Sequence, residues 1–426
     1  MTRSPLCDLS RFLTLAAAMV LATPRAGRGQ EWSRFRGPAG QGVAHDAQLP
    51  TALGDDHVRW RVPMGRGHSS PVLWGDRLFL TREGRGERQR EVVCLDANTG
   101  AVVWVRDDAF EPHAQHRLNS AAASTPVVDD LGVYVLWTSG EELIALALDH
   151  DGEKRWQRNL GPFQAQHGSG ASPELCDEML LIANEHESDG CSLLGLQRRT
   201  GETGWRVDRD AAERTGSYAS PLVYQPPAPD SAAYALFAST AHGLTAVAPA
   251  SGDVLWQLDL GFRARFVAHP CLVDDHALLC VGAGGGGKAG AVVRLPASAD
   301  DSATIAYRPR RHLPYVPNSI GLGGRFYSFT DGGIASCLEA ETGELVWRER
   351  LDGTFFSSPV SDGETIYLAS KEGVLFCLAA GDEYRLHGTC ALGESVFATP
   401  AIARDALYVR TAAQLICFGA AEAEDG

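Results

Sequence analysis

The chain has 426 residues, of which 46 are glycine and 22 are proline, and its formal net charge at pH 7 is −15. This composition favours many short strands joined by turns. The negative charge disfavours binding to nucleic-acid phosphates and to anionic membrane surfaces. No apolar run reaches the roughly 18 residues that a membrane-spanning helix needs, so we expect no transmembrane segment.

The first residues have the pattern of an export signal. Arg3 and Arg11 precede an apolar run over residues 12–22, and small residues follow it. A basic stretch, a short apolar run and a small-residue exit are typical of a secretory signal peptide. We therefore predict a signal peptide over residues 1–29, an N-terminal extension over residues 30–57, and a periplasmic or extracellular location.

The rest of the chain repeats one pattern eight times. Each copy begins with an anchor, usually Ser or Thr before Pro, and continues through a short turn into alternating strands. The anchors lie roughly 40 to 55 residues apart, which is the spacing of propeller blades. They are Ser70, Thr125, Ser172, Ser220, Ser358 and Thr399, with His269 and Asn318 as degenerate copies.

A tight turn followed by tryptophan closes most copies. Gly100 is followed by Trp104, and Gly343 is followed by Trp347 at the same offset. Glycine permits the positive φ that such a turn needs, and the even offset places the ring on the same strand face each time. We expect these rings to wedge between neighbouring blades. The tryptophans with this docking role are Trp60, Trp104, Trp156, Trp205, Trp256 and Trp347.

Two copies depart from the pattern. The fifth ends in Tyr307 instead of tryptophan, and the seventh ends near Tyr384 without the Thr-Gly turn. We expect the last strands of these two blades to pack less tightly than the others.

The two ends of the repeat indicate how the ring closes. The last copy holds only three strands, whereas a Trp60-bearing strand over residues 58–62 precedes the first copy. Pairing the two completes a blade and removes exposed sheet edges. The sequence therefore predicts an all-β fold, a single closed eight-bladed β-propeller over residues 58–419 with four antiparallel strands in each blade. An acidic tail over residues 420–426 follows.

The cysteines fall mostly at one repeated strand position, where we expect a small side chain in a tight interface. Four cysteines hold this position, and we predict that they are free thiols: Cys94, Cys337, Cys377 and Cys417. Ala145, Gly195 and Ala246 are the expected equivalents in other copies. Whether Cys176 bridges Cys191, or Cys271 bridges Cys280, stays open at this stage.

The element Asp-Ala-x-Thr-Gly-x-x-x-Trp resembles the tryptophan-docking motif of pyrroloquinoline-quinone (PQQ) repeats, as found in quinoprotein alcohol dehydrogenases. Residues 32–419 look like the shorter bacterial PQQ-like propellers, and they are more distantly similar to the propeller subunit of the outer-membrane β-barrel assembly machinery, which is a scaffold. In the dehydrogenases, adjacent cysteines, a calcium ion and a catalytic aspartate accompany PQQ. The chain has no adjacent cysteine pair. We therefore expect no cofactor, with PQQ and calcium as the alternative.

Two local motifs lack residues that their chemistry requires. Residues 282–289 nearly spell a phosphate-binding loop, but Ala289 replaces the required hydroxyl and a strand follows, so we interpret the segment as a turn between strands. His113 and His116 have no third ligand at a recognisable spacing, so we interpret them as surface residues and expect no metal site.

The connections between blades are long, and they share one face of the ring with other irregular loops. Loops on a rigid scaffold are where binding usually occurs. Residues just before the anchors are expected to surround the channel mouth on this face. They form the candidate ligand site: His68, His167, Tyr218, Arg265, Asn318, Phe356 and Phe397.

These observations favour an exported, monomeric, non-enzymatic scaffold that binds a protein or a small ligand on its loop-rich face. One alternative is a PQQ-dependent oxidoreductase in which Arg265 and Asn318 contact the carboxylates and carbonyls of the cofactor. A second alternative is a hydrolase or lyase that acts on polysaccharides. The sequence assigns no catalytic residue.

Overall fold

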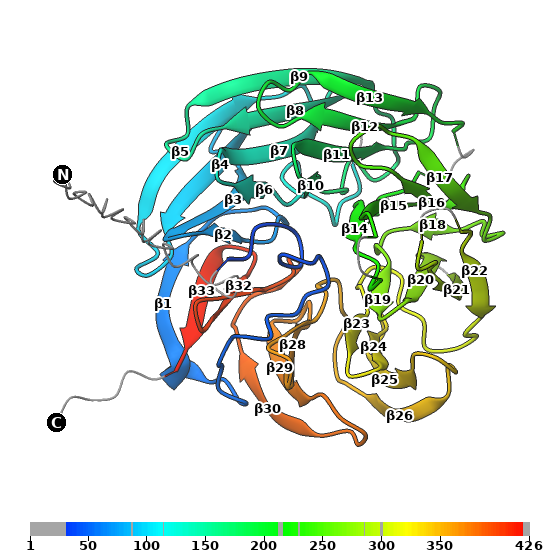
Figure 1. Ribbon diagram of the computed structural model, residues 1–426. Helices are drawn as coiled ribbons and strands as arrows, with labels where there is room; N and C mark the ends of the chain where they lie inside the picture. Colours follow the sequence, from blue (N-terminus) through cyan, green and yellow to red (C-terminus); the bar gives the residue numbers. More distant parts are fainter. Residues whose placement is uncertain are drawn as a thin grey trace, which may run out of the picture.

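The computed structural model describes residues 31–86, 88–113, 115–211, 216–228, 231–284, 286–298 and 301–420. These residues form eight antiparallel sheets arranged as a ring around a central channel (Figure 1). The predicted all-β fold, a closed eight-bladed propeller, is confirmed. The predicted signal peptide lies outside the described residues, as does the tail from residue 421 onwards. Within the described part, no helix is long and apolar enough to cross a membrane.

The blades follow one another in chain order. The first blade comprises β2 (Val72–Trp74), β3 (Arg77–Glu83), β4 (Gln89–Asp96) and β5 (Val102–Ala109), and the second comprises β6 (Val127–Asp129), β7 (Gly132–Ser139), β8 (Glu142–Leu148) and β9 (Lys154–Pro162). The third blade comprises β10 (Glu174–Cys176), β11 (Met179–Asn184), β12 (Ser192–Gln197) and β13 (Thr203–Asp208), and the fourth comprises β14 (Leu222–Tyr224), β15 (Tyr234–Ser239), β16 (Gly243–Val247) and β17 (Val254–Leu258).

The fifth blade has a fifth strand, and the eighth takes its outer strand from the N-terminal side. The fifth blade comprises β18 (Arg265–Phe266), β19 (Cys271–Val273), β20 (His276–Ala283), β21 (Gly286–Arg294) and β22 (Thr304–Tyr307), and the sixth comprises β23 (Ile320–Leu322), β24 (Arg325–Phe329), β25 (Ile334–Glu339) and β26 (Leu345–Arg350). The seventh blade comprises β27 (Val360–Ser361), β28 (Thr365–Ala369), β29 (Val374–Ala379) and β30 (Leu386–Ala391), and the eighth comprises β31 (Ala401–Ala403), β32 (Ala406–Arg410), β33 (Gln414–Gly419) and β1 (Val58–Pro63). A short 3-10 turn, Asp55–His57, precedes β1.

The ring closes through β1 as the sequence predicts. β1 pairs with β33, and Trp60 lies opposite Cys417. A buried arginine fastens the same junction, because Nη1 of Arg410 in the eighth blade donates to the carbonyls of Ser69 (3.0 Å) and Thr81 (2.8 Å) in the first. Strand pairing and a side-chain bridge therefore both join the ends of the ring.

The docking tryptophans make two contacts with the next blade. The Trp60 Nε1–H donates to the Ala97 carbonyl (3.2 Å), and its ring lies over Gly100, where a Cβ atom would come within 2.7 Å of the ring. Gly100 also has a φ of 72°, so the close approach and the turn both require glycine there. Trp104, Trp156, Trp205 and Trp347 also donate to carbonyls of the following blade.

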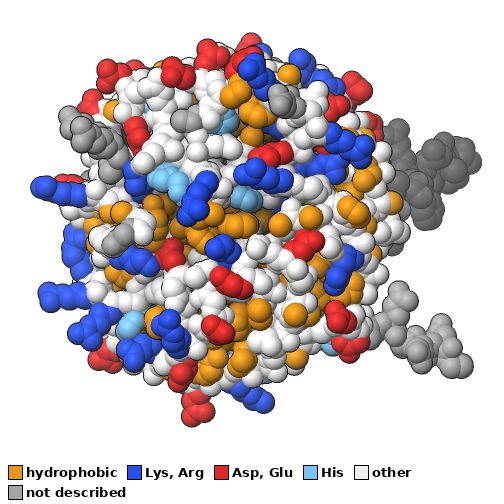
Figure 2. All heavy atoms as spheres, turned by 180° about the vertical axis from the view of Figure 1, so that it is seen from behind, with side chains coloured by type: hydrophobic (Ala, Val, Ile, Leu, Met, Phe, Trp, Pro, Cys, Tyr) orange, Lys and Arg blue, Asp and Glu red, His pale blue; other side chains and the backbone are white. Residues whose placement is uncertain are grey.

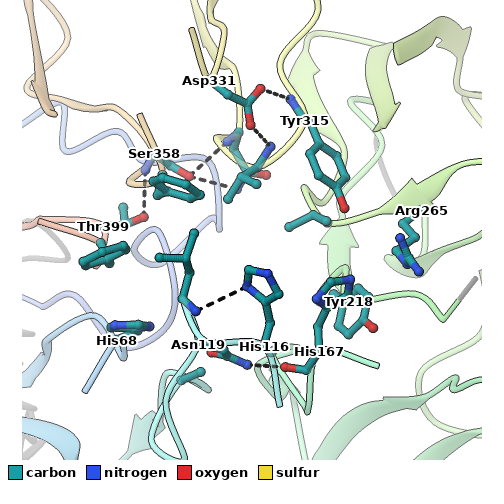
Figure 3. A pocket seen from close by; sticks show the side chains of 18 of the residues that line it. His68, His116, Asn119, His167, Tyr218, Arg265, Tyr315, Asp331, Ser358 and Thr399 are labelled. Carbon is teal, nitrogen blue, oxygen red and sulfur yellow. Dashed lines mark hydrogen bonds between the residues drawn. The ribbon is translucent and has the colours of Figure 1, made fainter. Parts of the chain in front are cut away.

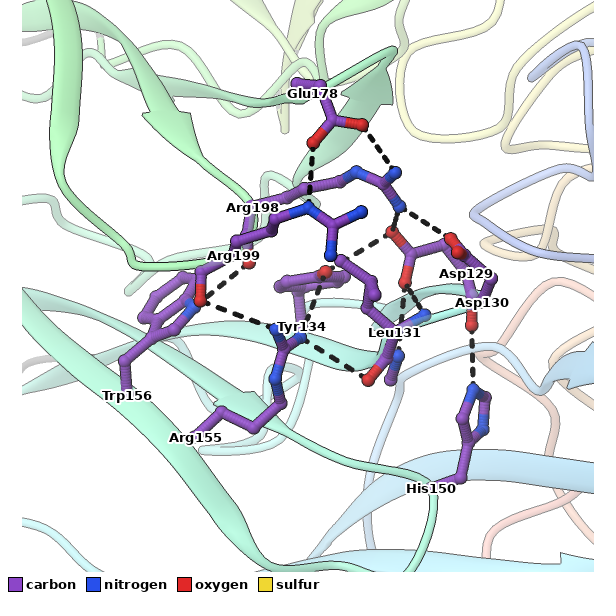
Figure 4. Close-up of polar contacts among 11 residues, drawn as sticks. Asp129, Asp130, Leu131, Tyr134, His150, Arg155, Trp156, Glu178, Arg198 and Arg199 are labelled. Carbon is purple, nitrogen blue, oxygen red and sulfur yellow. Dashed lines mark hydrogen bonds and ion pairs between the residues drawn. The ribbon is translucent and has the colours of Figure 1, made fainter.

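The junction between the second and third blades carries an additional polar network (Figure 4). The Arg198 guanidinium contacts Asp129, Asp130 and Glu178, each at 2.6 Å. The carbonyl of the same residue accepts the Trp156 Nε1–H at 3.0 Å. These carboxylates raise the pKa of Arg198, so the guanidinium is a permanent cation at this junction.

The two irregular blades, the fifth and the seventh, lack the docking tryptophan and have different residues in its place. In the fifth, the Tyr307 hydroxyl donates to the Ala340 carbonyl (2.8 Å) and its ring lies over Gly343. In the seventh, Gly388 stands opposite Cys377, where other blades have the ring. Tyr384 instead packs against Trp347 of the sixth blade, with ring centroids 5.6 Å apart.

The N-terminal extension covers the gap that Gly388 leaves. A Cβ atom at Gly388 would lie 3.2 Å from the Ala52 Cβ. Leu53 is buried in the core that includes Cys377, and the Tyr367 hydroxyl donates to the Pro50 carbonyl (3.0 Å). The extension therefore supplies the packing that a docking ring provides elsewhere.

Residues 31–44, which we name the central plug, cross the middle of the ring (Figure 1, dark blue). They bond to the inner strands of several blades: Trp32 to Leu73, Ser33 to Val128, Arg34 to Leu175, Gln41 to Leu272, and Ala44 to Ser361. Trp32 and Arg36 are fully buried, and Arg36 donates to the carbonyls of Ser319 and Gln41. The plug thus closes the channel at the level of the inner strands.

The cysteines at the repeated strand position lie directly opposite the docking residue of their own blade. Cys94 faces Trp104, and Cys337 faces Trp347. In the second blade this position is Ala147, opposite Trp156. The prediction that placed Ala145 there is wrong by two residues, since Ala145 lies opposite Arg158. The hairpin of this blade is one residue shorter than its equivalents, so that Ala147 stands nine residues before Trp156, whereas Cys94 stands ten before Trp104. All nine cysteines of the described residues are free, which leaves no bridge between the two pairs considered.

Candidate functional site

A cavity of about 700 Å³ occupies the channel where the inner strands begin (Figure 3). Seen from behind Figure 1, histidines and hydrophobic side chains gather near the centre of the molecule (Figure 2). The structure brings all seven sequence-predicted residues into the lining of this one cavity: His68, His167, Tyr218, Arg265, Asn318, Phe356 and Phe397. That they bind a ligand stays a prediction.

The anchors form a relay of hydrogen bonds around the cavity. The Ser70 N–H donates to the Thr125 hydroxyl (2.9 Å), the Thr125 N–H to the Ser172 hydroxyl (3.0 Å), and the Ser172 N–H to the Ser220 hydroxyl (2.8 Å). The relay continues from Asn318 through Ser358 to Thr399, each step at 3.0 Å. Five anchor hydroxyls therefore accept a backbone N–H of the preceding blade: Thr125, Ser172, Ser220, Ser358 and Thr399.

Two groups of aromatic rings face each other across the cavity. On one side, His68 stacks on Phe397 with centroids 4.7 Å apart, and Phe397 contacts Phe356. On the other, His167 packs between His116 (5.1 Å) and Tyr218 (5.8 Å). From the plugged end, Phe35 lines the cavity and contacts His269 edge-on. The cavity is therefore closed at one end and has walls suited to flat or ring-shaped molecules.

Three histidines of the cavity have lowered pKa values and are uncharged at neutral pH: His68, His167 and His269. Burial, assisted by the cations of Arg410 and Arg66, lowers the pKa of His68 to about 4. Burial and the Arg36 guanidinium lower the pKa of His269 to about 3. Burial and Arg265 lower the pKa of His167. Neutral imidazoles can both donate and accept hydrogen bonds.

Several buried polar atoms of the lining have no hydrogen-bond partner among the described residues. They are the Ser70 Oγ, the His167 Nε2, the His269 Nε2 and the Asn318 Oδ1. A buried polar atom without a partner costs about 1–3 kcal/mol. A ligand that offers hydroxyl, amide or carbonyl groups would recover part of this cost.

The lining has few charged groups, and most of them form ion pairs or hydrogen bonds with other residues. The Lys288 Nζ contacts Asp331 at 2.6 Å, and the Asp331 carboxylate also accepts the N–H groups of Tyr315 (3.0 Å) and Val316 (3.1 Å). Arg265 donates to Gln166 at 2.5 Å. Asp331 is the single carboxylate among the described residues of the lining.

Sequence reasoning missed several lining residues. His116 is exposed, as the sequence predicts, but it also lines the cavity beside His167, which the sequence did not indicate. The glycine-rich segment does form a turn between strands, β20 and β21, yet its Lys288 also lines the cavity. Phe35 and Tyr315 carry no repeat signal, because each stands in a segment that occurs once in the chain. Asp331 stands in the recurring turn between the second and third strands of a blade, but the equivalent residue of the seventh blade is Lys371.

The lining offers few carboxylate ligands for a calcium ion. Calcium in proteins takes six to eight oxygen ligands, usually with carboxylates among them. Asp331, the carboxylate in the lining, is engaged by Lys288 and by two backbone N–H groups. In the described part of the chain, no group of three or more His, Cys, Asp or Glu side chains is arranged to hold a metal ion.

The eight sheets, the docking rings and the anchor relay define a propeller of the PQQ-repeat class. Within this class, the family model described as "Outer membrane protein assembly factor BamB" matches residues 44–189, 167–294 and 317–417. These matches span most of the sequence, and the chain belongs to this family. Comparison with curated protein sequences gives no match.

Solved structures share the fold at low sequence identity. A europium-containing methanol dehydrogenase superposes with a TM-score of 0.70 at 11% identity, covering 92% of this chain and 98% of its own. BamB from Moraxella catarrhalis gives 0.58 at 15% identity, with coverages of 86% and 100%. Quinohemoprotein alcohol dehydrogenase from Comamonas testosteroni gives 0.63 at 12% identity, with coverages of 94% and 82%. These likenesses establish the fold alone.

Proposed function

We propose that the protein is an exported, non-enzymatic binding propeller whose central cavity holds a small, largely uncharged ligand that contains a ring. The observation that carries the proposal is a cavity of about 700 Å³ in which aromatic rings alternate with buried, neutral, unpartnered polar atoms. Its volume lies within the roughly 300–1,000 Å³ of small-molecule sites.

The chemistry of the walls indicates the kind of ligand. The rings of Phe356, Phe397 and His68 offer faces for stacking, and the His167 Nε2 and Asn318 Oδ1 offer hydrogen bonds on the other sides. A sugar ring or a heterocycle with hydroxyl, carbonyl or amide groups matches both features.

The proposed export rests on the N-terminal sequence and on the family. Residues 1–29 have the order of charge, apolar run and small residues that a signal peptide has. The matching family is described as an outer-membrane protein assembly factor. Both observations support an envelope location, where a monomeric propeller would present its loop-rich face to a ligand or a partner.

Calorimetric titration of the mature protein with mono- and disaccharides, nucleosides, and PQQ with calcium tests the proposal. We expect a saccharide or a nucleoside to bind, and Phe397→Ala to weaken that binding at least tenfold because a stacking face is lost. Leu386→Ala, which truncates an exposed apolar side chain on β30, is the matched control and should bind as the parent does.

Two results would count against this function. Failure of every saccharide and nucleoside to bind would contradict the small-ligand form of the proposal. A ligand at about 100 times its dissociation constant stabilises a protein by about 2.7 kcal/mol. A stabilisation of this size by PQQ with calcium would be measured as a rise in melting temperature. If that rise were lost in Arg265→Ala, it would support the oxidoreductase instead.

A further inference from the structure

A second, smaller pocket of about 280 Å³ lies beside the central cavity and shares Lys288 with it. Three segments form it: β21, the connection from β22 to β23, and the turn between β24 and β25. Its basic side chains are Lys288, Arg310, Arg311 and His312, and the remaining lining is Leu313, Thr330, Gly332 and Ile334. We name it the basic pocket.

The charge of the basic pocket is unusual for this molecule. The chain has 53 acidic and 38 basic residues, yet none of the described residues that line this pocket is acidic. Many other arginines of the described chain form ion pairs, such as Arg82 with Glu91 and Arg209 with Glu185. Arg310 and Arg311 have no hydrogen-bond or ion-pair partner in the described part of the chain.

The positive charge extends beyond the lining. Burial and the guanidinium groups of Arg348 and Arg311 lower the pKa of His312. The positive charge of Arg348 on β26 therefore also reaches the basic pocket. Figure 2 shows Lys and Arg side chains gathered beside a histidine towards the lower left of that face. Cations that repel one another in this way are stabilised when an anion binds between them.

The backbone that carries the arginines is held in place. Asp331 accepts the N–H groups of Tyr315 and Val316 and also contacts Lys288, which ties the connection between β22 and β23 to β21. Within this connection His312 has a φ of 61°, a left-handed conformation that costs a non-glycine residue energy. Leu313, the next residue, is buried. The basic side chains are therefore presented by a fixed segment.

We propose that the basic pocket binds a phosphate group. A guanidinium pairs with phosphate oxygens through two parallel hydrogen bonds, which Arg310 and Arg311 can supply. Lys288, at the side of the central cavity, is ion-paired with Asp331 and is not counted among the phosphate ligands. The site goes beyond the function proposed for the cavity and does not depend on it. The phosphate has two possible sources, a free anion or a phosphate group attached to a ring that enters the cavity.

Calorimetric titration of the mature protein with inorganic phosphate, at constant ionic strength set by chloride, tests the site. We expect saturable binding that is at least tenfold weaker in the double variant Arg310→Ala/Arg311→Ala. Both side chains are exposed, so the variant should keep the fold. Lys154→Ala/Arg385→Ala removes two exposed cations from other blades and should bind phosphate as the parent does.

A parent protein that fails to bind phosphate, or an equal loss in both double variants, would overturn the proposal. Titration with phenyl phosphate then identifies the source. Tighter binding than inorganic phosphate, lost in part in Phe397→Ala, supports the site and assigns the phosphate to a ligand of the cavity. Equal affinity for the two probes supports the site and assigns it to a free anion.

Discussion

The third and fifth blades differ in how closely they follow the repeat, and the fifth has β18 as an additional strand. In the third blade, the Ser172 hydroxyl accepts the Thr125 N–H, and Trp205 donates to the Pro249 carbonyl of the next blade. In the fifth, His269 replaces the anchor hydroxyl and leaves its Nε2 without a partner among the described residues. Local rules are usually broken where function requires it.

The fifth blade and the connection after it also supply most of the charged groups near the channel. Arg265 and Lys288 line the cavity, and Arg310 and Arg311 form the basic pocket. The third blade and the connection before it contribute no Lys, Arg, Asp or Glu side chain to the described lining, only Gln166, His167, Gly170 and Ser172. The comparison suggests that regular blades hold the ring together, whereas the irregular blade carries the chemistry. Each prediction below tests one side of this division.

The largest effect is expected at the regular junction that closes the ring. Trp60→Ala removes a buried ring that packs over Gly100 and donates to Ala97, so we expect a loss of about 3–5 kcal/mol of unfolding free energy. Urea denaturation measures it, with Leu345→Ala on exposed surface as the control. A loss below about 1 kcal/mol would show that β1 does not close the ring.

The second effect concerns acid stability and the irregular anchor His269. Its pKa is about 3 in the folded protein and about 6.5 when unfolded, so between these values only the unfolded chain holds the proton. Stability therefore falls as the pH falls below about 6.5, by at most about 1.4 kcal/mol per pH unit.

His269→Ser restores a hydroxyl of the kind that regular anchors have and removes this titration. The unfolding free energy of the variant, measured by urea denaturation at pH 7 and pH 5, should decline less than that of the parent by up to about 2 kcal/mol. The same substitution at exposed His45 is the control. Identical slopes in His269→Ser and the parent would show that His269 is not buried in the neutral form.

The third effect compares two anchor hydroxyls. Ser172→Ala leaves the buried Thr125 N–H without an acceptor and should cost about 1–3 kcal/mol. Ser70→Ala removes a hydroxyl that has no partner among the described residues and should change stability little. Thermal unfolding of the two variants side by side measures the difference, and equal losses would mean that the relay does not stabilise the ring.

The sequence was most informative where the chain repeats. Eight anchors and five turn–Trp elements were sufficient to predict the blade number and the closing pair β1–β33, because each blade must satisfy the same packing and hydrogen-bonding requirements. The seven predicted cavity residues were found for the same reason, since their positions follow from the anchors. The prediction failed at Ala145, because the β8–β9 hairpin is one residue shorter than its equivalents; the match of Ala147-Leu148-Asp149 with Cys94-Leu95-Asp96 is the signal that identifies Ala147.

The segments that occur once could not be predicted. The plug residues Trp32 and Arg36 contact blades that are distant in the sequence, so their burial depends on the complete ring. Lys288 was predicted in a turn but lies on β21, and its proximity to Arg310 and Arg311 arises only when three segments meet. Contacts of this kind have no period, and a repeat-based interpretation does not detect them.

The smallest expected effect is a difference in stability between variants of two tryptophans that are buried to nearly the same extent. Trp205 and Trp256 are 7% and 6% exposed, but Trp205 donates to Pro249, whereas the Trp256 Nε1 has no partner among the described residues. The fifth blade lacks the Thr-Gly turn whose carbonyl would accept it. Phenylalanine keeps an aromatic ring and removes the N–H, so Trp205→Phe should cost about 1 kcal/mol more than Trp256→Phe. Urea denaturation of both variants measures the difference. If Trp256→Phe were the more costly change, the junction into the fifth blade would be as regular as the others, and the division between structural and functional blades would fail.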